Sequence, residues 1–546
     1  MAYERNGVGA GMKALMDEMP DSLHADVTKY RDFALLRQAA LLDVPERTKC
    51  DRRAAQLRQE GNRLYLERQY GDALERYNES ICFAERDSDQ LGMGFANRSA
   101  IYCEQGEFEY ALANIALAKA HHYPEKLMPK LLARELSCRA KLDAGQSKGT
   151  VPNPGMDVNV NANPKIPFVA DGVGMKLYKQ FGRGLIAKRD FQVGDIILDE
   201  KPTLVTNGLG YRYTNCANCS TGFNHSLLPC PGCVSYMYCS EECLQRDKRF
   251  VHRFECGMAE KLRNAMFCST IIGPKLFFYG LTLFDDDLQA MMDYCHGKTA
   301  QGLGNPFEMD FRTKDQLDQF KVLHKAGVHH ITILDKVHQV SAAVFYVLFI
   351  KHSPLLQRLV TTQAQRDFVL NCFLDYIRKC DTFLLDTTES STVSLVGSIV
   401  NHSCDPNAAF TVHGGHIKLA VLRPIAKGEQ ILASYGPTWW QPKPDYESCY
   451  KCKCIVCTKP SWSTKQGTLP PAAVQHDRLI TTISCSSEAN FADRLNVMQQ
   501  FLNRYAENHT DVAYGEVLKL YNLLLKGMIQ LDLTTGERAK VAASLK

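Results

Sequence analysis

Apolar positions along the chain change from helical to strand-like spacing, and these changes divide the sequence into segments. Residues 54–87 and 91–124 each contain one pattern of small and aromatic positions, and the matching positions lie 38 residues apart. Small residues at Ala73 and Ala111 permit close helix packing, and aromatic residues three positions earlier fill the space between turns. This pattern predicts two helix-turn-helix units, although a plain helical bundle has similar spacing. The aligned positions are Gly61, Tyr70, Ala73, Tyr77 and Ser80 in the first copy and Ser99, Phe108, Ala111, Ile115 and Ala118 in the second.

Other patterns fill the rest of the chain. Residues 144–167 are rich in Gly, Pro and Asn without an apolar period, which predicts a linker. Short β-type runs between turn residues over 184–202 and 416–435 predict small antiparallel strands. Between these runs, residues 259–388 contain segments with helical spacing, and so does the tail, 491–546. We therefore expect a multidomain α+β protein whose β-rich part is interrupted by other modules.

Length and composition narrow the class of protein. A chain of 546 residues with 45% apolar residues can bury more than one core. The N-terminus lacks the apolar stretch of a signal peptide, and the run 341–350 is far shorter than the roughly 20 residues that span a bilayer. We expect an intracellular protein without a membrane segment. The net charge of +4 is small, so direct nucleic-acid binding is not expected.

The 21 cysteines are clustered, which in a reducing compartment favours metal binding over disulfides. Eight Cys and His residues between 216 and 256 form two Cys-x-x-Cys pairs followed by two pairs with three-residue gaps. Such gaps place both ligands of a pair one helical turn apart, and eight ligands complete two tetrahedral sites with no position left for water. We expect structural zinc. The eight are Cys216, Cys219, Cys230, Cys233, Cys239, Cys243, His252 and Cys256.

This order of ligands resembles the MYND zinc finger, in which the two sites interleave. The resemblance implies that the first zinc takes Cys216, Cys219, Cys239 and Cys243, and that the second takes Cys230, Cys233, His252 and Cys256. It also implies a protein-interaction module for proline-rich peptides or co-repressor partners. The repeats resemble tetratricopeptide repeats, whose usual period is about 34 residues, and imply a groove for a peptide or chaperone partner.

Three separated segments share a further resemblance. They are Gly182-Arg183-Gly184-Leu185, the run 401–407 (NHSCDPN), and the run 428–436 (GEQILASYG). In this order they resemble the SET domain. Because the zinc finger stands between the first two segments, the chain resembles the SET and MYND protein-lysine methyltransferase family, in the branch with N-terminal tetratricopeptide repeats. The resemblance implies methyl transfer from S-adenosylmethionine to lysine side chains of histone or other proteins.

The resemblance also implies roles for single residues. Tyr435 would be the catalytic tyrosine, whose hydroxyl orients the lysine amine. The expected cofactor-binding residues are Gly182, Arg183, Gly184, Ser398, Asn401, His402, Tyr435 and Tyr450. A third zinc ion, in a post-SET site, would take Cys404, Cys452, Cys454 and Cys457, with Cys449 as a competing ligand. Trp439 and Trp440 either line the substrate mouth or cover core.

Two departures from the family leave an alternative open. Asp381-Thr382-Phe383 stands where many relatives have an asparagine, and Leu395-Val396-Gly397-Ser398 lacks a Tyr-Pro step. The alternative is a weakly active or inactive scaffold that acts as a transcriptional co-repressor. A DNA-binding zinc protein is disfavoured by the small charge.

The expected location is the cytoplasm and nucleus. The expected domains are an N-terminal helical segment (1–53), tetratricopeptide-like repeats (54–143), a linker (144–167), the first SET part (168–212), the MYND finger (213–256), a helical SET insertion (257–390), the SET core (391–440), the post-SET segment (441–460) and a helical C-terminal region (461–546).

Overall fold

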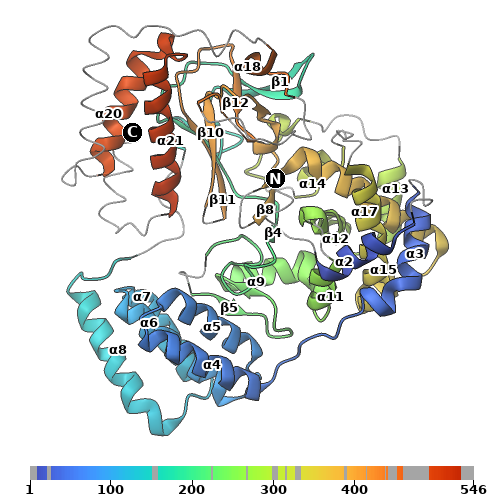
Figure 1. Cartoon of the computed structure of the whole chain (residues 1–546), viewed down its shortest axis with the longest axis vertical. Coiled ribbons are helices and arrows are strands. Elements are labelled where there is room, and N and C mark those ends of the chain that lie inside the picture. The colour runs from blue at the N-terminus through green and yellow to red at the C-terminus, as the bar shows by residue number, and fades with distance from the viewer. Residues whose placement is uncertain are drawn as a thin grey trace. The chain divides into compact units, whose positions relative to one another are not determined.

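A computed structural model gives the fold of the chain, which divides into two compact units, each made from three stretches of sequence (Figure 1). The first unit comprises Met1–Pro152, Leu204–Gln301 and Ala326–Val393, and the second Asn153–Thr203, Gly302–Lys325 and Ser394–Lys546. No helix in the described part of the chain is both long and apolar enough to cross a membrane. The structure describes residues 9–20, 26–149, 158–222, 226–265, 268–297, 305–313, 316–325, 334–386, 390–413, 415–436, 438–440, 452–458 and 491–530.

The first unit contains two helical hairpins where the sequence repeats. Helix α4 (Asp51–Leu66) packs on α5 (Tyr70–Phe83), and α6 (Asp89–Glu104) packs on α7 (Phe108–Ala120), while α8 (Met128–Asp143) covers α7. The small positions explain the close packing, because a Cβ atom on Gly61 would lie 2.5 Å from the Tyr77 ring of the facing helix. Ala73 and Ala111 are fully buried, as the pattern predicts. The chain therefore has a helix-rich N-terminal region.

The remainder of the first unit joins the cysteine-rich segment to a group of long helices. Helix α17 (Gln363–Phe383) packs on α12 (Ile272–Leu283) and on α15 (Asp335–His352), and the N-terminal α3 (Val27–Leu41) also packs on α15. The other elements are α2 (Ala10–Glu18), η1 (Glu125–Leu127), β4 (Leu204–Asn207), β5 (Leu228–Pro229), β6 (Met237–Tyr238), α9 (Glu241–Asp247), η3 (Lys248–His252), α10 (Arg253–Glu255), α11 (Ala259–Ala265), η4 (Cys268–Ile271), α13 (Leu288–His296), α16 (Pro354–Leu359), β7 (Leu384–Asp386) and β8 (Ser390–Val393), with sheets ordered β4-β8-β7 and β5-β6.

The second unit is built on two small sheets, which agrees with the strand patterns of the sequence. The first has the order β1 (Val173–Tyr178), β2 (Gly182–Ala187), β12 (Gln430–Ala433) and β9 (Asn401–His402). The second has the order β10 (Ala408–His413), β11 (His416–Val421) and β3 (Ile196–Glu200). The C-terminal helices α20 (Phe491–Arg504) and α21 (Val512–Gln530) share an apolar core with β10 and β11 (Figure 1). The unit also contains η5 (Pro306–Glu308), α14 (Gln316–Lys325), η7 (Gly397–Ile399), α18 (Ile455–Thr458) and η9 (Ala506–Asn508).

One stretch of the predicted helical insertion belongs to the second unit. Residues 302–325 cluster there, whereas the flanking parts of the insertion belong to the first unit. The Phe311 ring meets the Phe168 ring edge to face at 4.9 Å, and the Phe311 N–H donates to the Lys165 carbonyl at 2.8 Å. These two contacts attach the stretch to residues 165–168 of the second unit, which helical spacing in the sequence does not indicate.

Candidate cofactor and metal sites

The three SET-like motifs lie on neighbouring strands of one sheet in the second unit. Strand β12 pairs antiparallel with β2, with Ile431 opposite Leu185. It also pairs in parallel with β9, with Leu432 opposite Asn401 and Ala433 opposite His402. Motifs that are more than 200 residues apart in the sequence are thus brought within adjacent strands. The three motifs therefore lie close enough together to contribute to one site.

The two glycines of the first motif are required for different reasons. Gly182 has φ of +70°, a left-handed conformation that favours glycine, and a Cβ atom there would meet nothing within 4 Å. A Cβ atom on Gly184 would lie 2.5 Å from Gln430 Nε2 and 2.6 Å from Asn401 Nδ2. Gly184 therefore makes room for two side-chain amides of the sheet. Its predicted approach to a cofactor stays a prediction.

Asn401 and His402 are both engaged within the protein. The Asn401 Nδ2 atom donates to the Arg183 carbonyl at 2.8 Å, which ties β9 to β2. Burial lowers the pKa of the His402 imidazole to about 4, so the ring is neutral at pH 7. Its Nδ1 atom accepts a hydrogen bond from the Tyr435 backbone N–H at 2.9 Å. The side chain of His402 thus fixes the strand end that carries Tyr435.

Tyr435 stands at the surface of this site. Its side chain is 58% exposed, while its ring lies 5.3 Å from the His402 ring. Its hydroxyl donates to the Val400 carbonyl. The ring is thus held in place and remains accessible to a substrate.

Two polar side chains to which the sequence assigned no role lie against Gly184, Gln430 through Nε2 and Tyr178 through a ring carbon. The Tyr178 hydroxyl and the Gln430 Nε2 atom are buried without a hydrogen-bond partner among the described residues. Both side chains lie against the position of a Cβ atom on Gly184. Buried polar groups are normally satisfied, so this part of the site fits a polar ligand. The only signal in the sequence is that Tyr178 precedes the first motif and Gln430 lies within the third.

The last cysteine group lies beside this sheet, as the sequence predicts. Cys404, Cys452, Cys454 and Cys457 have their sulfur atoms within 4.8 Å of one another and can hold a metal ion. The Gln180 side chain donates to the Lys453 carbonyl at 3.0 Å, which attaches the cysteine-rich turn to the β1–β2 hairpin. The predicted adenine-stacking Tyr450 and the competing ligand Cys449 lie outside the described residues.

Trp439 packs toward the C-terminal helices. Its indole N–H donates to Asp405 Oδ1 at 3.0 Å, and its backbone N–H donates to the Cys404 carbonyl at 2.8 Å. A Cβ atom on Gly515 would lie 2.7 Å from the Trp439 ring. Its neighbour Trp440 packs against the apolar core of these helices, which agrees with the second expectation for Trp440.

The cysteine-rich segment of the first unit forms two interleaved groups, each able to hold a metal ion. They have the composition expected from the sequence. The groups are Cys216, Cys219, Cys239 and Cys243, and Cys230, Cys233, His252 and Cys256.

The local structure corrects one expectation about this segment. Cys256 N–H donates to the His252 carbonyl at 2.7 Å, so this pair is separated by one helical turn, as predicted. Cys239, however, precedes α9, which begins at Glu241, so it does not share a helix face with Cys243. Ser240 is the N-cap of α9, because its hydroxyl oxygen accepts a hydrogen bond from the Cys243 N–H.

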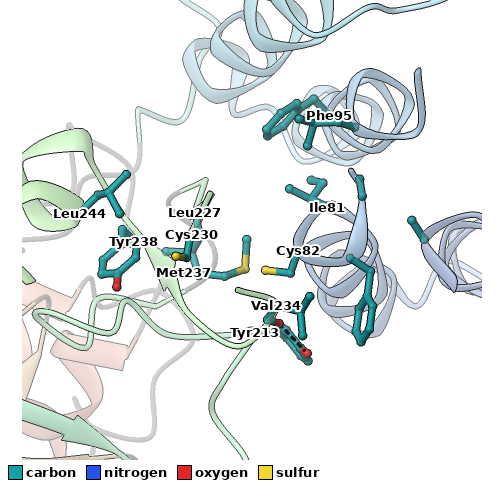
Figure 2. Packing of buried hydrophobic residues seen from close by; sticks show 14 of the residues in the cluster. Ile81, Cys82, Phe95, Tyr213, Leu227, Cys230, Val234, Met237, Tyr238 and Leu244 are labelled. Atoms are coloured by element: carbon teal, nitrogen blue, oxygen red, sulfur yellow. Dashed lines mark hydrogen bonds between the residues drawn. The ribbon is translucent and has the colours of Figure 1, made fainter. Parts of the chain in front are cut away.

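The helical hairpins pack directly on this cysteine-rich segment. Figure 2 shows Ile81 and Cys82 of α5 near Val234 and Met237 in one apolar cluster. Arg98 of α6 is completely buried beside this cluster. Its guanidinium donates to the Leu227 carbonyl at 2.6 Å, to Asn78 Oδ1 at 2.8 Å and to Asn114 Oδ1 at 2.7 Å. The sequence reasoning missed Arg98, since a single arginine in a helix carries no signal of its burial.

Comparisons with known proteins agree with this geometry. The family description of the SET domain matches residues 182–436. The chain is 22% identical to protein-lysine N-methyltransferase SMYD4 of Mus musculus over 73% of this chain and 66% of that protein. It is 24% identical to SMYD4 of Homo sapiens, with the same coverage. It is 24% identical to histone-lysine N-methyltransferase ASHR1 of Arabidopsis thaliana over 52% of this chain and 55% of that protein.

The paired strands, the three motifs and the adjoining cysteine group define a SET-domain protein. The chain thus contains a SET domain over residues 182–436. Its similarity to SMYD4 of Mus musculus extends over 73% of its length, including the two cysteine groups of the first unit.

Proposed function

We propose that this chain is an S-adenosylmethionine-dependent protein-lysine N-methyltransferase. The observation that carries the proposal is the position of Tyr435, held at the edge of a sheet whose neighbouring strands contain Gly184 and Asn401. The Gln430 Nε2 atom, buried without a hydrogen-bond partner among the described residues, adds an unsatisfied polar group beside Gly184. S-adenosylmethionine, when bound, supplies an electrophilic methyl group.

The residues of the site have mainly positioning tasks, because methyl transfer requires two aligned reactants and a neutral amine. His402 is neutral and holds the backbone of Tyr435 through Nδ1. The Tyr435 hydroxyl is oriented by the Val400 carbonyl, and from there its oxygen can accept a hydrogen bond from a lysine amine. Gly182, Arg183, Gly184, Ser398, Asn401 and His402, together with Tyr450, would hold the cofactor.

The finer features of the family are part of the same proposal. Two zinc ions would occupy the interleaved finger groups, and a third would join Cys404 to the post-SET cysteines. The helical hairpins would be tetratricopeptide repeats, and the domain boundaries would be those predicted from the sequence. The finger would recruit proline-rich or co-repressor partners, the repeats a peptide or chaperone partner. We place the protein in the cytoplasm and nucleus.

Calorimetry with S-adenosylmethionine tests the proposal first, since a wild-type protein that binds none contradicts it. Methyl-lysine mass spectrometry of cells then compares the wild type with Tyr435→Phe. We expect the variant to lose activity by about 100-fold or more, since one positioned proton-transfer or hydrogen-bonding group contributes 10²–10⁴-fold in enzymes. Tyr70→Phe, on α5 in the other unit, is the matched control and keeps full activity.

A non-catalytic scaffold is the second candidate. The observation in its favour is that the Asn401 amide, expected to bind the cofactor, already donates to the Arg183 carbonyl. Partner binding and a cellular effect that survive both Tyr435→Phe and His402→Ala would support the scaffold. Loss of the effect in both variants would support the enzyme.

A further inference from the structure

A buried carboxylate lies under the segment that leads to the SET-like turn. Glu200 is the last residue of β3 and is only 3% exposed. Its Oε1 atom accepts a hydrogen bond from the Leu395 N–H at 2.6 Å. Its Oε2 atom accepts from the Ser394 hydroxyl at 2.5 Å, from the Val396 N–H at 3.1 Å and from the Gly397 N–H at 2.9 Å. Three successive backbone amides and one hydroxyl thus converge on one side chain.

The amides that Glu200 binds lie immediately before the residues expected to hold the cofactor. The 3₁₀ helix η7 begins at Gly397, and strand β9 follows with Asn401 and His402. The Val400 carbonyl between them accepts from the Tyr435 hydroxyl. A displacement of the turn at Gly397 would therefore move both the cofactor-binding residues and the partner of the catalytic tyrosine.

We propose that Glu200 is a positioning residue for the turn at Ser394–Gly397. Its carboxylate holds the Ser394 hydroxyl and the three backbone N–H groups that follow, so that Ser398, Asn401 and His402 are preorganised for S-adenosylmethionine. This inference rests on the function proposed above. It adds a residue outside the three motifs, and it assigns to that residue an effect on cofactor affinity in addition to stability.

The physical reason is that both oxygens of this carboxylate accept hydrogen bonds from the turn. Burial raises the pKa of Glu200, and the four hydrogen bonds oppose this rise by favouring the charged form. Strand β3 gives the carboxylate a firm base, because Glu200 pairs with Ile417 and Leu198 with Leu419 of β11. Glu200→Gln replaces one of the two acceptor oxygens with an NH2 donor, which leaves buried N–H groups of the turn unpaired, and this is costly. The turn would then rearrange toward water.

The neighbouring residue on β3 is a matched control. Asp199 points to the other side of the strand, where its carboxylate pairs with Lys418 at 2.9 Å and with His416 at 2.8 Å. Asp199→Asn therefore weakens the same unit without touching the turn at Ser394–Gly397. A variant of Glu200 that acted only through stability would behave like this control.

The experiment measures S-adenosylmethionine affinity by calorimetry for the wild type, Glu200→Gln, Glu200→Asp and Asp199→Asn, at a temperature where each protein is folded by circular dichroism. We expect Glu200→Gln to weaken binding about ten-fold or more, since small misplacements in a site cost up to about 100-fold. Glu200→Asp recovers part of this loss, and Asp199→Asn binds within about two-fold of the wild type, as expected for a site outside the turn. Equal affinity of Glu200→Gln and wild type overturns the inference, as does an equal loss in both Glu200→Gln and Asp199→Asn.

Amide hydrogen exchange of the wild-type protein decides the case in which Glu200→Gln does not fold. We expect slow exchange at Leu395, Val396 and Gly397, because all three amides are bound and buried. Exchange as fast as in an open loop overturns the inference. If the wild type binds no cofactor, the proposed function fails together with it; if the wild type binds and Glu200→Gln binds equally well, only the role of Glu200 fails.

Discussion

The cysteine groups of the two units differ in their surroundings. In the first unit, Cys216 and Cys230 are buried in the same apolar cluster as the helical repeats. In the second unit, Cys457 is exposed and Cys452 is half-buried, and the group lies beside His402 of the candidate site. Similar ligands thus serve two purposes. A metal bound by the cysteine groups of the first unit would be part of a folding core, whereas a metal bound in the second unit would join a surface turn to the candidate site.

Removal of a finger ligand should have the strongest effect on stability. Cys230→Ser takes a ligand from the group that packs against α5, and structural zinc contributes on the order of 10 kcal/mol of folding free energy in small fingers. We expect the first unit to lose metal and to melt at a much lower temperature. Atomic emission and calorimetry measure the two quantities. Cys50→Ser, at the start of α4 and outside the metal groups, is the control; equal melting of both variants would contradict a folding role.

Arg98→Met tests the connection between the repeats and the finger. The variant leaves the oxygens of Leu227, Asn78 and Asn114 buried without their donor. Each unpaired group costs about 1–3 kcal/mol, so a total loss of about 3 kcal/mol or more is expected. Denaturant unfolding measures this loss. Arg139→Met on α8, where the arginine side chain is 61% exposed, should change stability by less than about 0.5 kcal/mol.

Asp199→Asn tests how much a buried ion pair contributes to the stability of the second unit. The variant leaves the Lys418 ammonium, which is 1% exposed, without its carboxylate partner. Loss of one member of a buried pair typically costs about 3–5 kcal/mol, and the partial exposure of His416 places the expectation near the lower figure. A much smaller loss would contradict a stabilising role of this ion pair.

The same pair predicts a pH dependence. Burial alone would raise the pKa of Asp199, but the hydrogen bond from His416 and the charge of Lys418 hold this pKa below its usual value. A depressed carboxylate pKa stabilises the fold above the unfolded pKa of about 3.9, and this contribution is lost as pH falls through the folded value. The stability difference between wild type and Asp199→Asn should therefore shrink below about pH 4. A difference that stays constant in acid would contradict this assignment.

Cys457→Ser should have the smallest effect on stability. The residue is exposed at the end of its group, so we expect less than about 1 kcal/mol for unfolding of the second unit. Cofactor affinity should fall about ten-fold, a typical effect of weakening the support of a metal or catalytic site. The two cysteine variants should therefore differ: Cys230→Ser lowers the stability of the first unit, whereas Cys457→Ser lowers mainly the cofactor affinity. Unchanged affinity would remove the link between this group and the site.

Features that depend on neighbouring residues could be predicted from the sequence. The spacing of Cys216 with Cys219 and of Cys230 with Cys233 depends on a few consecutive residues, so the ligand groups could be stated from the pattern and the family resemblance. The two helical hairpins were visible for the same reason, because helical periodicity is a local property. The adjacency of the three SET-like motifs came from the resemblance to a family.

Long-range contacts were beyond such reading. Arg98 is an ordinary helix residue until Leu227, 129 positions later, accepts its hydrogen bond. Glu200 has no distinguishing pattern in the sequence, and only the folded chain brings the N–H groups of Leu395 and Val396 to its carboxylate. Hydrogen-bond partners of this kind depend on which surfaces meet after folding, and the spacing of residues along the chain has no record of that. The residue types thus established which chemistry was available, and the folded arrangement alone decided which charged groups became buried and what they hold in place.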